Sequence, residues 1–253
     1  MALVTGARLL DLPGPVHAAW SDASRGDLRP RGPGPGDGRG LSAFAADVAT
    51  ATDCTIGEVF WSTQVHGNRV LDVRVGPHPT PVDGGPSLGS AGPGDALVSD
   101  RPGVALCVLT ADCGALALSS PEGVFAAVHA GWRGLLDGVV EATVGEMRAR
   151  GATDVVGALG PCIHAGCYEF SGPDLDAVAA TYGDTVRGRT STGRPALDVP
   201  AGIGAALARA GARTIDGVDV CTACGDGYFS HRARHDRGRQ ALVVWSGRPR
   251  DGR

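Results

Sequence analysis

The sequence contains no lysine, so all 23 of its basic side chains other than histidine are arginines. A chain without a side-chain amine cannot form a Schiff base or supply the lysine of a phosphate-binding loop. It also has no run of about 20 apolar residues, the length that a membrane-spanning helix needs. We therefore expect no membrane partner, and arginines or backbone N–H groups must bind any anion.

Strong charge of either sign is also lacking, since the net charge is −4 over 253 residues. This gives no general attraction to nucleic acid. The start of the chain has no basic leader followed by a sustained apolar core. The seven cysteines are irregularly spaced, which is typical of a reducing compartment. We expect a cytoplasmic protein of one domain, 1–253, that is a monomer or homodimer.

Segments 28–40 and 76–95 are rich in glycine and proline and are predicted to be surface loops. Strands are predicted to dominate the core, because short apolar runs of the β type recur along the chain: "EVFWSTQV", "NRVLDVRV", "GVALCVLT", "ALALSS", "GVFAAVHA", "DVVGAL", "GVDVCT" and "QALVVWSG". One long helix is predicted between Leu135 and Met147, where residues of one face recur at helical spacing. Two more helices are expected to open at Gly172 and after Pro200. Strands and helices do not alternate strictly, which indicates an α+β or mixed α/β class.

Three reactive residues stand where apolar runs end beside small residues: His66 in "QVHGN", Cys113 in "TADC" and His129 in "HAGWRG". Two imidazoles and a thiolate are a sensible ligand set for Zn²⁺, with a fourth position for water or substrate. A single Cu²⁺ would also suit this set. The spacing leaves open that they are a turn histidine, a buried thiol and a hydrogen-bonded core histidine.

The "HAGWRG" turn leads from an apolar run into the predicted helix. Free N–H groups at the start of a helix attract anions, and Arg133 would add a bidentate contact to a phosphate or carboxylate. Trp132 either stacks on a flat ring or packs in the core. In the simpler interpretation, Arg133 is only a solvated surface residue.

Other reactive side chains lie in "PCIHAGC", "CTAC" and "FSHRARH". The C-x-x-C spacing raises the hypothesis of a structural zinc site built from Cys162, Cys167, Cys221 and Cys224, although buried free thiols are the preferred interpretation. The remaining histidines considered are His164, His231 and His235. A solvated surface is the preferred interpretation of the "FSHRARH" turn, the alternative being that it faces an anionic substrate.

The motifs "QVHG", "TADC", "HAGWRG", "GPCI" with "CYEF", and "CT" followed by "FSHR" and "GR" resemble, in this order, those of the YfiH/LACC1 family, also known as DUF152 or the polyphenol oxidase laccase domain family. The resemblance runs from about Val59 to Trp245. It implies an α+β fold, a layered sandwich of mixed β-sheets with flanking helices in a single domain. It also implies a catalytic zinc on His66, Cys113 and His129.

The resemblance further implies purine nucleoside phosphorylase activity on adenosine, inosine and methylthioadenosine, with adenosine deaminase activity and an older assignment as a copper-dependent polyphenol oxidase. The partners would then be a purine nucleoside and phosphate. Gln64, Trp132 and Arg133 are expected to bind substrate, and Arg133 also to act in catalysis. Asp112 and Glu169 are candidates to shuttle protons by motif proximity, each with a turn or structural role as the alternative. One departure from the family is Ala115, where proline is common.

Other chemistries are constrained by the residues themselves. No histidine is followed two residues later by glutamate, so the zinc nucleobase-deaminase signature is absent. Seven histidines without an H-x-H pair make a multicopper oxidase hard to build. A cysteine hydrolase with Cys113 as nucleophile and His129 as base remains an alternative. A non-enzymatic, metal-stabilised interaction module is a further one.

Overall fold

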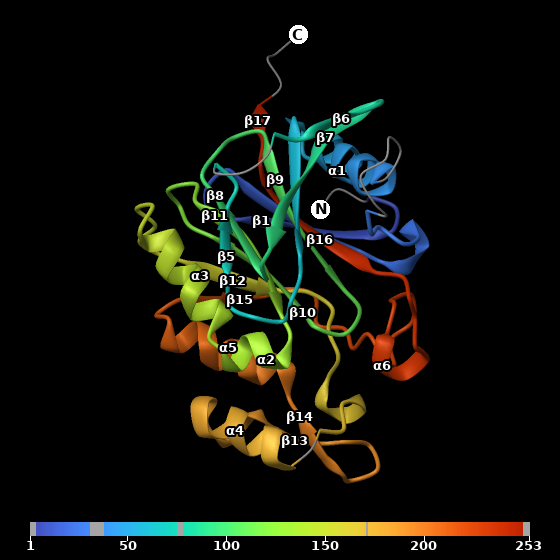
Figure 1. The fold of residues 1–253 in the computed structure, drawn as a ribbon, viewed down its shortest axis with the longest axis vertical. Coiled ribbons are helices and arrows are strands. Elements are labelled where there is room, and N and C mark those ends of the chain that lie inside the picture. Colours follow the sequence, from blue (N-terminus) through green and yellow to red (C-terminus); the bar gives the residue numbers. More distant parts are fainter. Residues whose placement is uncertain (1–3, 31–37, 75–77, 171, 250–253) are drawn as a thin grey trace.

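Two mixed β-sheets packed face to face form the centre of the computed structural model, which describes residues 4–30, 38–74, 78–170 and 172–249 (Figure 1). In spatial order, the larger sheet contains β1 (Ala7–Leu12), β2 (Val16–Ser21), β16 (Gln240–Ser246), β9 (Val104–Thr110), β4 (Glu58–Thr63), β7 (Gly85–Pro93) and β6 (Thr80–Val82). The smaller contains β15 (Arg213–Ile215), β12 (Val156–Leu159), β10 (Gly114–Ser119), β11 (Phe125–Ala130), β8 (Ala96–Ser99) and β5 (Val70–Asp72).

Helices cover the two outer faces. On the larger sheet lies α1 (Arg39–Ala51). Against the smaller sheet pack α2 (Trp132–Leu136), α3 (Val139–Arg148) and α5 (Val199–Arg209). Helix α4 (Gly172–Tyr182) packs on α2 and α5, farther from the sheet, with the ribbon β13 (Arg187–Arg189) and β14 (Pro195–Leu197) beside it (Figure 1). A short helix, α6 (His231–Arg234), precedes β16, and β3 (Cys54–Thr55) pairs with β17 (Arg248–Pro249). The predicted α+β layered sandwich is confirmed.

Alternating side chains divide the core into layers. In β9, Leu106 and Val108 face the smaller sheet, whereas Ala105 and Cys107 face α1. In β11, Phe125 and Ala127 point between the sheets, and Ala126 and Val128 point to the helices, as the two-residue period of a strand requires. His129, two residues beyond Ala127, therefore stands on the inter-sheet side at the end of its strand.

The predicted helix over 135–147 is interrupted. Helix α2 ends at Leu136, and α3 begins at Val139 after Gly138, whose φ of +82° no continuous right-handed helix contains. The apolar periodicity survives because both pieces pack on the same sheet. The helix expected at Gly172 is confirmed as α4, and the helix expected after Pro200 is α5, which begins one residue before that proline, at Val199, and is capped by the Asp198 side chain.

The loop predicted over 76–95 is wrong, because β6 and β7 fall within it. Strand β7 pairs in parallel with β4, and a Cβ on Gly89 would lie 3.2 Å from the Phe60 ring, so its small residues make room for a large neighbour. The run "GVDVCT" forms only an isolated bridge between Cys162 and Cys221. In the predicted loop 28–40, residues 31–37 lie outside the described residues and α1 begins at Arg39. No helix among the described residues is long and apolar enough to span a membrane.

Candidate metal centre and active site

The structure brings His66, Cys113 and His129 together from three parts of the chain. The potential ligand atoms of these residues all lie within 4.8 Å of one another, and the Cys113 Sγ lies 3.9 Å from the His66 Nε2. His66 follows β4, Cys113 precedes β10 and His129 is the penultimate residue of β11. The predicted three-residue group is therefore present as a cluster.

Strand pairing places two of these residues side by side. Gly114 pairs with Ala130 and Ala115 with His129 in the antiparallel ladder of β10 and β11, so Cys113 lies next to the end of β11. His66 comes from the other sheet, where it stands in a turn with a φ of +60°. Two hydrogen bonds of 2.8 Å between the Gln64 amide and the backbone of Leu109 hold that turn against β9.

A buried carboxylate, Asp95, organises the group. It accepts hydrogen bonds from the backbone N–H groups of Val65 (3.2 Å), His66 (2.9 Å) and Gly67 (2.9 Å), and from the Nδ1 of His129 (2.8 Å). Burial would raise the pKa of Asp95, but these hydrogen bonds, above all that from His129, lower it. Because Asp95 occupies the Nδ1 of His129, the other ring nitrogen is left for a metal, an arrangement common in metal sites.

Cys113 and His129 shift each other's pKa. Burial would raise the pKa of the Cys113 thiol, but the imidazoles of His129 and His66 lower it to about 6. Burial would likewise lower the pKa of His129, but the Cys113 thiolate and Asp95 raise it to about 9. The sulfur is thus a thiolate at neutral pH, the form that binds metals and acts as a nucleophile.

Two glycines of "HAGWRG" allow the His66 turn to approach α2. A Cβ on Gly131 would lie 2.7 Å from the His66 ring and 3.4 Å from the Cys113 sulfur, and a Cβ on Gly134 would lie 2.6 Å from the Gly67 carbonyl oxygen. The small residues of this motif are therefore required by the close packing of two segments around the ligand cluster.

The cluster fits a metal with three protein ligands and one open position. Metal–nitrogen and metal–sulfur bonds of about 2.0 and 2.3 Å separate tetrahedral ligand atoms by roughly 3.5 Å, so small side-chain shifts would close the set. The anchored His129 ring and the thiolate of Cys113 provide the donor states that a metal needs. These three residues can therefore hold a metal ion.

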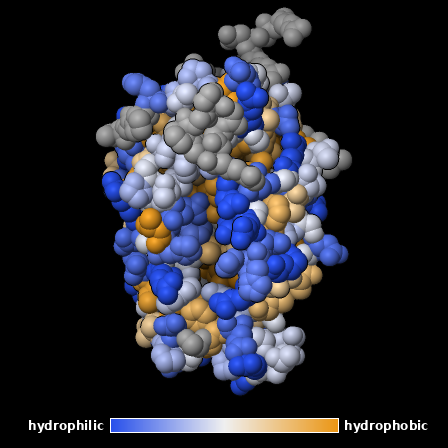
Figure 2. Space-filling view, turned by 45° about the vertical axis from the view of Figure 1, so that its right-hand side comes forward, coloured by the Kyte–Doolittle hydropathy of each residue, from blue (hydrophilic) through white to orange (hydrophobic). Residues whose placement is uncertain are grey.

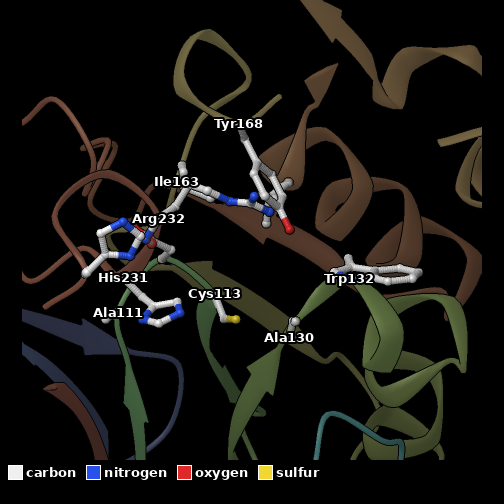
Figure 3. Close-up of a pocket in the computed structure, with 12 residues that line it drawn as sticks. Ala111, Cys113, Ala130, Trp132, Ile163, Tyr168, His231 and Arg232 are labelled. Atoms are coloured by element: carbon white, nitrogen blue, oxygen red, sulfur yellow. Dashed lines mark hydrogen bonds between the residues drawn. The ribbon is translucent and has the colours of Figure 1, made fainter. Parts of the chain in front are cut away.

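Two cavities, of about 350 and 490 Å³, meet at the cluster and share Ala111, Cys113 and His231 in their walls. The smaller cavity is closed by Trp132, Tyr168 and Val199 and by Arg232 (Figure 3). In that view Tyr168 and Arg232 stand together on one side, Trp132 on the other, and Cys113 below them. The larger cavity includes His66, His129, Gln64 and two arginines, Arg29 and Arg239. In Figure 2, recessed hydrophobic areas lie among hydrophilic residues on one face of the molecule.

Asp112 and Gln64 line the cavities, but their polar atoms are already engaged. The Asp112 carboxylate accepts hydrogen bonds from Thr222 Oγ1 (2.7 Å) and from the backbone N–H of Arg232 (2.6 Å). Gln64 binds Leu109 through both its amide oxygen and its amide nitrogen. Both side chains therefore position the segments that carry other site residues.

Arg133 and Glu169 do not line either of the two cavities. The Arg133 guanidinium is exposed and stacks on Trp132, 4.5 Å from the ring centroid. Glu169 is half-exposed and forms an ion pair of 2.5 Å with Arg194. Trp132 lines the smaller cavity and also packs edge-on against Phe170, with ring centroids 5.2 Å apart.

Several site residues are absent from the sequence-based predictions. Asp95 was part of a predicted loop, and only its place directly before an apolar run marks it. In "FSHRARH", His231, Arg232 and His235 are exposed, in line with the preferred interpretation as a solvated surface, and they also line the smaller cavity. Tyr168, which lines the smaller cavity, was not predicted as a site residue; in its motif "CYEF" the predicted residue was Glu169.

Comparison with known proteins identifies relatives of this chain. Residues 42–247 match the family model described as multi-copper polyphenol oxidoreductase laccase. A purine nucleoside phosphorylase of Streptomyces coelicolor is 38% identical over 192 residues, 74% of each chain. One of Streptomyces griseus is 34% identical over 254 residues, covering 96% of this chain and 99% of the relative. The crystal structure of Bacillus licheniformis hypothetical protein YfiH superposes with a TM-score of 0.72 at 21% identity, covering 96% of this chain and 99% of that one.

Proposed function

The chain belongs to the YfiH family of laccase-domain proteins, and from this premise we propose that it is a zinc-dependent purine nucleoside phosphorylase. The observation that carries the proposal is the cluster of His66, Cys113 and His129 at the junction of an aromatic cavity and a cationic one. The relatives named purine nucleoside phosphorylase support the reaction class. Adenosine, inosine and methylthioadenosine are the proposed nucleosides.

The smaller cavity suits the purine. Its volume of about 350 Å³ is at the lower end of the usual range for small-molecule sites. Trp132 and Tyr168 offer flat faces or edges to a heterocycle, and Ile163 and Val199 complete an apolar wall. We propose that the base is bound between these side chains, with the ribose toward Cys113.

Arg232 is our proposed phosphate contact in place of Arg133. Its guanidinium lies 5.0 Å from the Tyr168 ring centroid, and in the described part of the chain no carboxylate forms an ion pair with it. Its backbone N–H is fixed by Asp112, and His231 and His235 stand beside it. An arginine that stacks on Tyr168 and has no carboxylate partner can hold phosphate in place for attack on the anomeric carbon.

The chemistry then depends on positioning. Bound zinc would supply a Lewis acid beside the reacting groups. Asp95 holds the His129 ring and the His66 turn, and Asp112 holds the Arg232 backbone, so that phosphate and nucleoside meet in a fixed geometry. The cytoplasm is the proposed location, since a reducing compartment keeps the Cys113 thiolate free. The chain would act there as a monomer or homodimer.

Product analysis tests this proposal. Protein of measured metal content is incubated with each nucleoside, with and without phosphate, and the products are identified by mass. Free base plus ribose 1-phosphate, formed only with phosphate, is the expected result. Inosine formed from adenosine without phosphate would instead indicate deamination, and no product from any nucleoside would refute an enzyme of this kind.

A second candidate function is hydrolysis with Cys113 as nucleophile. The observation that favours it is the chain of contacts from the Cys113 thiolate to His129 and from His129 Nδ1 to Asp95 at 2.8 Å, which resembles a catalytic triad. It predicts that the metal-free protein is active and that iodoacetamide abolishes that activity. Stoichiometric zinc that is required for turnover would exclude it.

A further inference from the structure

Three cysteines outside the first cluster also converge. The sulfurs of Cys167, Cys221 and Cys224 all lie within 4.8 Å of one another, although two segments more than 50 residues apart supply them. Cys167 ends a short 3₁₀ turn, Ala165–Cys167, and the other two lie in "CTACG". The fourth cysteine of the sequence hypothesis, Cys162, is buried in the core and is not part of this group.

The backbone around Cys221 is shaped to hold a thiolate. The N–H of Gly225 donates to the Cys221 carbonyl oxygen at 2.7 Å and closes the C-x-x-C-G turn. A Cβ at position 225 would lie 2.5 Å from that oxygen, so only glycine closes the turn without a shift. From the other segment, the backbone N–H of His164 donates to the Cys221 sulfur at 3.4 Å. Backbone N–H donors to sulfur favour its charged form, which is the metal ligand.

We propose that Cys167, Cys221 and Cys224 form a second metal site, which takes a thiophilic divalent cation such as Zn²⁺ or Cd²⁺. Zinc–sulfur bonds of about 2.3 Å separate tetrahedral ligands by roughly 3.8 Å, which the observed cluster approaches. A disulfide would use two of the sulfurs and leave the third without a role, whereas a metal uses all three. Cys224 is exposed, so a fourth ligand can come from solvent.

The site would fasten two walls of the smaller cavity to each other. Tyr168, which lines that cavity, directly follows Cys167. Thr222, which directly follows Cys221, donates a hydrogen bond to the carboxylate of Asp112 at 2.7 Å. A metal between the two segments would therefore fix Tyr168 relative to Asp112 and Cys113. This role is structural and does not depend on the proposed reaction.

Cadmium binding tests the proposal, because thiolate–cadmium bonds absorb in the ultraviolet. The full-length, reduced protein carrying His66→Ala and Cys113→Ala, which disrupt the first cluster, is titrated with Cd²⁺ and followed by absorbance and native mass spectrometry. We expect one bound Cd²⁺ per chain. Adding Cys224→Ser should weaken that binding at least tenfold, whereas Cys54→Ser, a change at a cysteine outside the group, should leave it unchanged.

The wild-type chain provides a second measurement if the disrupted background does not fold. Wild type should bind one more equivalent of metal than Cys224→Ser, whose exposed position makes misfolding unexpected. Equal metal content in these two proteins would overturn the proposal. So would a disulfide within the group, seen as a 2 Da lower mass and two missing thiols in protein isolated without reductant.

Discussion

Replacing Asp95 with asparagine should weaken metal binding and stability together. The Asp95 carboxylate is fully buried and accepts four hydrogen bonds, three from the turn that carries His66 and one from His129. Asparagine keeps one acceptor oxygen, and its NH₂ group faces one of two pairs of donors. These are the backbone N–H groups of Val65 and Gly67, which cannot accept, or the backbone N–H of His66 and the Nδ1–H of His129, whose tautomer would have to invert. Either orientation of the amide therefore loses two of the four bonds.

The size of both effects follows from these contacts. Hydrogen bonds to a charged group contribute about 1.5–3 kcal/mol each, so the loss of two should lower the free energy of unfolding by roughly 3 kcal/mol or more. Residues that orient metal ligands typically change metal affinity about 10- to 100-fold when mutated. We expect Asp95→Asn to bind Zn²⁺ at least tenfold more weakly than wild type while remaining folded.

Two assays decide the matter. Competition with a chromophoric chelator gives the zinc affinity, and urea unfolding of metal-free protein gives the stability. The matched control is Asp100→Asn, a surface carboxylate 3.5 Å from Arg74 that should change neither quantity appreciably. The lowered pKa of Asp95 stabilises the fold at pH values above the unfolded value of about 3.9, so the stability difference should shrink as the pH falls below it. Unchanged zinc affinity in Asp95→Asn would refute its assigned role.

Three further results are expected. Steady-state kinetics should show that Arg232→Gln raises the KM for phosphate about tenfold. Arg133→Gln, at a guanidinium outside both cavities, should change that KM less than twofold. A larger KM increase in Arg133→Gln than in Arg232→Gln would identify Arg133 as the anion contact. Gly131→Ala should reduce zinc affinity in the chelator assay, because its Cβ would lie 2.7 Å from the His66 ring; a zinc affinity equal to that of wild type would count against the close approach. Gly145→Ala, with open space around it in α3, should instead raise the free energy of unfolding by about 0.5–1 kcal/mol. In metal-free protein, alkylation of Cys113 should be half-maximal near pH 6, because the neighbouring imidazoles lower the pKa of its thiol; a midpoint near the ordinary thiol pKa would contradict this.

Much of the architecture could be predicted from local patterns. The strands β8 to β12 and β16 coincide with apolar runs of the sequence. These strands are apolar on both faces because one face packs against the other sheet and the other face packs against helices. Strand β7 could not be found this way. Its glycines and prolines resemble a loop, and only its parallel neighbour β4 and the bulk of Phe60 explain why small residues stand there.

The ligand cluster shows the same division. His66, Cys113 and His129 could be chosen from the sequence, because each is a metal-binding residue type at the end of an apolar run. Their convergence could not, since it depends on the register that pairs Ala115 with His129 and on a turn from the opposite sheet. The sequence hypothesis for the other cysteines named four residues, of which the structure groups three.

By itself, then, the sequence determined which chemistry is available: no amine, a few thiols and imidazoles beside small residues, and apolar runs that must pair into sheets. Only the tertiary structure decided which of those groups act together. In the structure, Asp95 hydrogen-bonds a ligand of the cluster, Arg232 lines the smaller cavity and Arg133 lies outside it. The positions of Asp95 and Arg232 depend on contacts between segments far apart in the chain. Local composition does not encode such contacts, since long-range packing sets them.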